Sequence, residues 1–168
     1  MLDMETAYNK SIDMLFTHAK NTIQSVGELP FLILIPVQNS YVILAIAVPP
    51  EANNYDLFYN CGELSYNGVR SINETFNFVV CAFISLAVRV PPDVDIRPFS
   101  LLPDKDMKDN LEILSLVATD REGILDHKEY VIHRQDDISK EIEFEEIHYS
   151  SVKSFVMDAF WDGVGTGQ

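Results

Sequence analysis

Four histidines and two cysteines are the side chains with the greatest capacity for metal or covalent chemistry. The β-hairpin that we expect near the C-terminus pairs positions whose numbers sum to 275, so it places His127 opposite His148. Two imidazoles supply only half of a zinc site, and Glu129 and Glu146 are the nearest further ligands. The sequence therefore predicts no complete metal site, with His127 and His148 as a candidate pair.

The other reactive residues do not match the pattern of a nucleophilic or nucleotide-dependent enzyme. Neither Cys61 nor Cys81 has a histidine close to it in the sequence. The Gly-x-Ser-x-Gly elbow and the glycine motifs that cradle phosphates or dinucleotides are missing. We therefore expect no catalytic residue and no cofactor, and a metal-dependent hydrolase that uses His127 or His148 is the least favoured alternative.

An acidic row is the first feature that could bind another protein. Glu141, Glu143 and Glu145 alternate along an expected strand, so they share one face of it. Such a row could imitate a nucleic-acid strand for a basic partner. The alternative is a solvated strand face whose charges are held by Arg134 and Lys128.

A group of aromatic residues is the second such feature. It lies between the two N-terminal strands and the next expected helix, and consists of Tyr55, Phe58, Tyr59 and Tyr66. Tyrosines are common anchors at protein interfaces. The alternative is that a loop uses these rings to pack over the sheet.

The composition indicates a globular, acidic protein. Of 168 residues, 47% are apolar and 23% charged, and 12 basic against 26 acidic side chains give a net charge of −14. That balance argues against direct binding to nucleic acid or to an anionic membrane, which needs clustered Lys and Arg. The start of the chain has no signal-peptide pattern and no segment spans a membrane, so we expect a cytoplasmic protein with reduced cysteines.

The N-terminal part of the chain indicates a helix followed by a hairpin. Residues 4–26 carry an apolar stripe at three- and four-residue steps, and Gly27 suits the left-handed position that ends a helix. Two apolar runs at 31–35 and 41–48 then predict paired strands. Neither run alternates with polar residues, so we expect both faces of the hairpin to be covered.

A short edge strand and a second helix are expected next. Residues 55–60 indicate the edge strand. Ser71 and Glu74 match a Ser-x-x-Glu capping box, which predicts a helix over 72–89. That segment is apolar almost all round, which is typical of a helix buried on most sides.

The C-terminal part contains a long connection at 91–110, rich in Pro and Asp, and then three strands at 111–119, 128–135 and 140–147. The expected register of the last two faces Val131 with Phe144 and His133 with Ile142 on the core side.

The chain is then expected to end in a helix and a tail. A third helix begins after Ser150 and Ser151 and ends at Gly163, and residues 164–168 form a loose tail.

These elements predict a single α+β domain over residues 1–168, an antiparallel sheet of five to six strands with three helices in the order α-β-β-(β)-α-β-β-β-α. That order resembles the order in profilin-like and roadblock-type modules and in the acidic secretion-chaperone fold. The resemblance covers the order of elements alone, without a shared motif.

The apolar surface leads to the functional expectation. The hairpin calls for cover on both faces, and one copy offers little to shield it, so we expect a homodimer. The expected role is a non-enzymatic protein-interaction module of the adaptor, chaperone or inhibitor type that binds another protein, and the net charge of −14 suits a basic partner. A small-ligand sensor is the first alternative, with Asn73, Asn77 and Ser85 as pocket residues.

Overall fold

The computed structural model describes residues 4–38, 40–47, 54–88, 110–134, 141–147 and 157–166. The helices are α1 (Met4–Val26), α2 (Asn54–Arg70) and α3 (Met157–Thr166). The strands are β1 (Phe31–Val37), β2 (Ser40–Ile46), β3 (Val79–Val88), β4 (Asn110–Asp120), β5 (Gly123–His133) and β6 (Glu143–Ile147).

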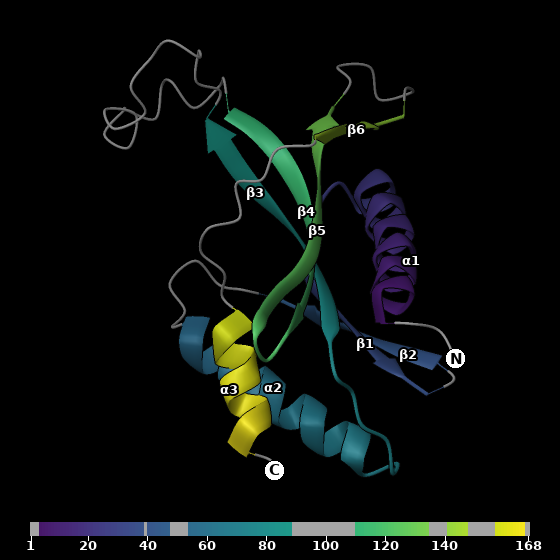
Figure 1. Cartoon of the computed structure of the whole chain (residues 1–168). Coiled ribbons are helices and arrows are strands. Elements are labelled where there is room, and N and C mark those ends of the chain that lie inside the picture. Colours follow the sequence, from purple (N-terminus) through teal and green to yellow (C-terminus); the bar gives the residue numbers. More distant parts are fainter. Residues whose placement is uncertain are drawn as a thin grey trace.

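The six strands form one antiparallel sheet in the order β2-β1-β3-β4-β5-β6. α1 packs on one face of the sheet, and α2 and α3 lie together on the other (Figure 1). The expected α+β class, with a six-stranded antiparallel sheet and three helices, is confirmed for the described part of the chain. Residues 89–109, which hold nearly all of the expected long connection, lie outside that part.

α1 has the bounds that the apolar periodicity predicts. Its fully buried positions, Ile12, Leu15, Ala19 and Ile23, repeat at three- and four-residue steps and pack against the sheet. Gly27 ends the helix with a φ of 88°, and its N–H donates to the Ile23 carbonyl at 2.8 Å. A residue with a side chain would be strained in that conformation, which explains the glycine.

β1 is buried on both faces, as its unbroken apolar sequence predicts. Leu32 and Leu34 face α1, whereas Ile33 and Ile35 face α2 and α3. All four side chains are at most 2% exposed. For β1 the helices of the same chain provide the cover that the hairpin was expected to need, whereas β2, the second strand of the hairpin, keeps Tyr41 and Val42 exposed.

The expected states of residues 55–60 and 72–89 are both wrong. The first segment lies in α2, where Phe58, Gly62, Ser65 and Val69 share one buried face at helical spacing. The second contains β3, which is buried on both faces, like β1. A continuous apolar run fits a buried helix or a buried strand equally well, so periodicity could not separate them.

The Ser71–Glu74 motif ends a helix instead of starting one. Asn73 has a φ of 60°, its N–H donates to the Arg70 carbonyl, and the Glu74 N–H donates to the Val69 carbonyl. This pair of bonds around a left-handed residue is the Schellman motif, which satisfies the last carbonyls of a helix. Asparagine adopts that conformation more readily than most side chains.

The register of β5 and β6 differs by one residue from the expectation. Paired positions sum to 276 instead of 275, so Ile132 lies opposite Phe144, and both pack in the core with α1. A slip of one residue exchanges the two faces of a strand. Accordingly His133, expected on the core side, is exposed and lies opposite Glu143.

α2 and α3 pack closely because each contributes a glycine at their contact. A Cβ on Gly62 would lie 1.9 Å from the Phe160 carbonyl oxygen, and one on Gly163 would lie 1.9 Å from that of Tyr59. Gly163 was expected to end the third helix, but α3 continues to Thr166 and Val164 is fully buried. The expected start at Ser150 and Ser151 lies outside the described residues.

Replacing Gly62 or Gly163 with Ala should separate the two helices and lower the free energy of unfolding by about 1–3 kcal/mol, the usual cost of overpacking. Gly68→Ala in α2 is the matched control, since nothing lies within 4 Å of its Cβ position. Its helical propensity should leave stability equal or higher by up to about 1 kcal/mol. Urea denaturation followed by circular dichroism measures all three variants, and unchanged stability in Gly163→Ala would contradict the close contact.

Candidate functional site: the uncovered edge of the sheet

The sheet ends in two edge strands of opposite character, β2 and β6. Among the residues that the structure describes, β2 pairs with β1 alone, in a continuous register from Phe31 opposite Ile46 to Val37 opposite Ser40. Natural edge strands are normally protected by charge, proline or a bulge, because their unpaired backbone groups invite another strand.

β2 lacks those protections. Its sequence, SYVILAI, has no charged residue and no proline, and its register with β1 shows no bulge. Tyr41 and Val42 are 47% and 41% exposed, and Ala45 is exposed as well. This strand therefore presents an apolar edge that suits pairing with another chain. The sequence of the hairpin is apolar throughout, so it did not indicate that β2 would lie at the edge of the sheet.

β6, in contrast, is protected by charge. The candidate residues Glu141, Glu143 and Glu145 are all exposed, and Glu146 is too. Since Phe144 points toward α1, its neighbours Glu143 and Glu145 lie on the opposite face of the strand. A Glu145 carboxylate oxygen lies 2.8 Å from His133 Nε2.

A groove of about 560 Å³ runs between α1 and β6. Its floor includes Phe16 and Tyr130, whose rings stack at 4.2 Å, and Lys20 lies 5.6 Å from the centre of the Phe16 ring. Glu141 and Glu146 also line it, and Glu143 borders it although its side chain lies on the other face of β6. Burial, followed by the charges of Glu146 and Asp13, raises the pKa of Tyr130. The aromatic floor with its negative rim favours a cationic group, and Lys20 already supplies one over the Phe16 ring.

The four candidate aromatic residues do not form one surface. Phe58 is 1% exposed and belongs to the core. Tyr55 is exposed, stacks on Tyr59 at 6.0 Å and donates a hydrogen bond to an Asp162 carboxylate at 2.8 Å, which raises the pKa of Tyr55. Tyr66 lies farther along α2 and lines a separate pocket. At 3.6 residues per turn, Tyr55, Tyr59 and Tyr66 lie within about 40° of one another around α2, whereas Phe58 is turned toward the core.

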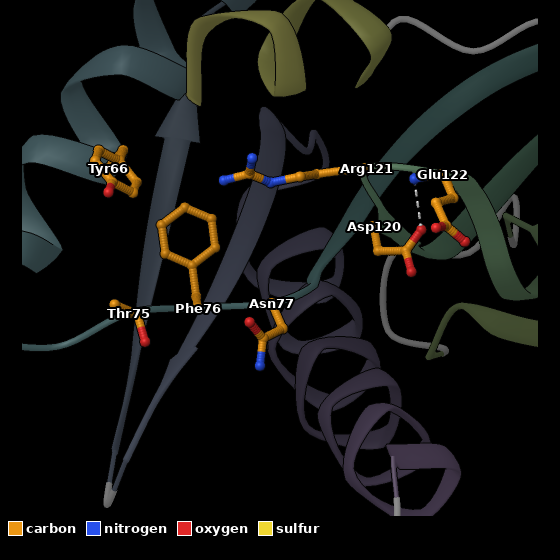
Figure 2. Close-up of a pocket in the computed structure, with 7 residues that line it drawn as sticks. All are labelled: Tyr66, Thr75, Phe76, Asn77, Asp120, Arg121 and Glu122. Atoms are coloured by element: carbon orange, nitrogen blue, oxygen red, sulfur yellow. Dashed lines mark hydrogen bonds between the residues drawn. The ribbon is translucent and has the colours of Figure 1, made fainter. Parts of the chain in front are cut away.

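That pocket, of about 430 Å³, lies between α2, the segment before β3 and the β4–β5 turn. Figure 2 shows the Arg121 side chain extending toward Tyr66 and Phe76, with Glu122 directed the other way. Asp120 shapes the turn, because its carboxylate accepts hydrogen bonds from the N–H groups of Glu122 and Gly123. The remaining lining residues are Thr75 and Asn77.

The candidate pair of metal ligands, His127 and His148, is described in the structure for His127 alone. His127 pairs with Val117 of β4, and the observed register removes the basis for placing it opposite His148. His148 lies outside the described residues. No group of three or more His, Cys, Asp or Glu side chains suited to a metal occurs in the described part. No helix in that part is long and apolar enough to cross a membrane.

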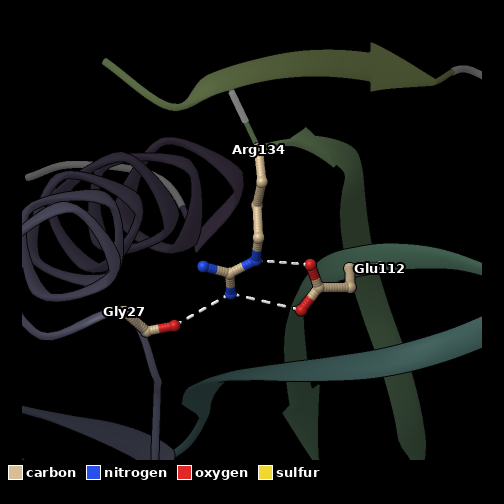
Figure 3. Close-up of polar contacts among 3 residues, drawn as sticks. All are labelled: Gly27, Glu112 and Arg134. Carbon is tan, nitrogen blue, oxygen red and sulfur yellow. Dashed lines mark hydrogen bonds and ion pairs between the residues drawn. The ribbon is translucent and has the colours of Figure 1, made fainter. Parts of the chain in front are cut away.

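Arg134 and Lys128 were expected to hold the acidic row, but both point elsewhere. Arg134, just after β5, donates two hydrogen bonds to the Glu112 carboxylate and one to the Gly27 carbonyl at 2.8 Å (Figure 3). The hydrogen bond with Glu112 is the main cause of the raised pKa of Arg134. Lys128 lies 3.7 Å from Asp13 of α1. Both cations therefore tie α1 to the strands beside it, and neither holds the glutamates of β6, of which Glu145 lies beside His133.

Replacing Arg134 with Lys should lower the free energy of unfolding by about 0.5–1.5 kcal/mol, because a single ammonium cannot reproduce the fork that binds Glu112 and Gly27 together. The partial exposure of both side chains keeps the effect modest. Arg121→Lys at the exposed turn is the control and should change stability by less than about 0.5 kcal/mol. Equal urea denaturation midpoints for the two variants would contradict a structural role for Arg134.

Comparison of the chain with protein-family models, with curated proteins and with solved structures found no match.

Proposed function

We propose that this protein is an interaction module of the adaptor, chaperone or inhibitor type that works as a homodimer on another protein. The observation that supports it is that the edge strand β2 is uncharged and exposes Tyr41 and Val42 near its start. A strand with free backbone donors and acceptors and apolar side chains can pair with another strand without burying a charge.

The support for a dimer differs from the argument that the sequence provides. β1 and β3 are shielded by the helices of their own chain, so neither calls for a second copy. The strand without a neighbour on one side, among the described residues, is β2. An exposed strand edge needs backbone partners, and a second subunit can supply them.

The groove between α1 and β6 is the surface that we assign to the other protein. It combines the aromatic floor of Phe16 and Tyr130 with glutamates on its rim. A lysine or arginine of a partner would find carboxylates there, beside the Phe16 ring over which Lys20 already lies. The net charge of −14 would also speed the approach of a basic partner at low salt.

The homodimer is tested by sedimentation at micromolar concentration, where we expect a species of twice the chain mass. Val42→Lys should raise the dissociation constant by about tenfold or more, because the new charge would be buried unpaired at the joined edge. Val26→Lys is the matched control, since Val26 is 71% exposed at the end of α1 and lies away from β2. A wild-type protein that sediments as a monomer would rule out the dimer.

A small-ligand sensor is the second candidate, supported by the pocket in Figure 2. Arg121 makes no ion pair with the described residues, and Phe76 and Tyr66 offer aromatic surface beside it. A guanidinium next to rings suits a small aromatic carboxylate.

Binding at this pocket has a built-in reporter, because the ring of Phe76 lies 5.9 Å from Trp161, the single tryptophan of the chain. Titration with benzoate and related carboxylates should change the tryptophan emission in a saturable way, and Arg121→Gln should weaken that binding by about tenfold. Lys10→Gln on α1 is the control for the loss of a positive charge. No saturable change with any of these carboxylates would count against the sensor.

A further inference from the structure

We propose that the two copies of the dimer join edge to edge, with β2 of one copy antiparallel to β2 of the other and a twofold axis at Ile43. This inference rests on the proposed homodimer and names the surface and the register that form it. The result would be one continuous sheet across both copies, with the two β6 strands at its far ends.

Pro36 reveals which backbone groups of β2 point outward. In the hairpin Pro36 lies opposite Tyr41. Directly opposed residues of an antiparallel pair either exchange two N–H···O bonds or exchange none, in strict alternation. Since proline has no N–H, its pair with Tyr41 is one that exchanges none. The N–H and C=O of Tyr41 therefore point away from β1.

The alternation extends this result along β2. Ile43 and Ala45 have the same phase as Tyr41, so their N–H and C=O groups also face the free edge. Ser40, Val42, Leu44 and Ile46 direct theirs toward β1. A second strand at this edge would find donors and acceptors at three evenly spaced positions.

One register uses all three positions in both copies. It places Tyr41 opposite Ala45 of the second copy, Ile43 opposite its own equivalent, and Ala45 opposite Tyr41. Each hydrogen-bonded pair exchanges two bonds, so three pairs give six. A register shifted by two residues in either direction leaves one outward position of each copy unpaired.

The side chains fit this register on both faces of the joined sheet. On the α1 side the large Tyr41 lies against the small Ala45, and two copies of Ile43 meet at the axis. On the other side Val42 lies against Leu44 of the second copy. Cross-strand pairs of this kind stabilise sheets, and none of them brings two charges together.

The other ways of joining edges are less favourable. Pairing β6 with β6 would bring Glu143, Glu145 and Glu146 of two acidic chains together. Pairing β2 with β6 is a head-to-tail contact that leaves a free edge on every added copy, and so leads toward open filaments. Pairing β2 with β2 uses both apolar edges and closes the assembly at two copies.

Amide hydrogen exchange, measured residue by residue by NMR, tests the register. In the dimer the amides of Tyr41, Ile43 and Ala45 should be protected, and dilution to monomer should speed their exchange by about tenfold or more. The amides of Val42 and Leu44 bond to β1 and should keep their protection at every concentration. A dimer in which the three outward amides exchange freely would overturn the inference and leave the proposed homodimer standing.

Proline supplies a matched pair of variants. Ala45→Pro removes an outward N–H that β1 does not use, so the hairpin should persist while the dimer dissociates. Ala45→Thr keeps the N–H and should keep the dimer. A dimeric Ala45→Pro with the wild-type dissociation constant would overturn the register.

A charge pair covers the case in which the proline variant does not fold. Tyr41→Lys and Ala45→Glu should each weaken self-association, and mixing the two variants should restore a heterodimer, because the new lysine would lie opposite the new glutamate. Failure of the mixture to associate more tightly than either variant alone would overturn the register. A monomeric wild type would instead overturn both the inference and the homodimer.

Discussion

The backbone of β1 must make all of its hydrogen bonds inside the sheet, because apolar side chains and helices cover both of its faces. An unpaired N–H or C=O in such a place costs as much as a lost hydrogen bond or more. β3 meets this need on one side and β2 on the other. β2 thus completes the core, but no strand of the described chain does the same for β2.

Two further sets of contacts hold the helices against the two faces of the sheet. The glycines of α2 and α3 bring two helices close enough to act as one cover over Ile33 and Ile35. Arg134 holds the end of α1 to β4 through Gly27 and Glu112, which keeps the α1 layer in place beside β5 and β6. The two edges of the described sheet differ in charge, since β2 is neutral and β6 is acidic.

Several elements could be predicted because their signals are local. The stripe of α1 and its terminal glycine depend on residues within a few turns, and so does the hairpin of β1 and β2. The residues of α2 and β3 were assigned the wrong states, because an unbroken apolar run carries no period and YDLFYN has the composition of a strand. The β5–β6 register depends on the length of a connection that local patterns do not specify.

The sequence by itself determined that residues 40–46 would carry no charge and would be mostly apolar. It also determined the acidic character of residues 141–146. Only the tertiary structure decided that these two segments would be the edges of one sheet. Strand order is set by contacts between residues far apart in the chain, and those contacts depend on which helices cover which face.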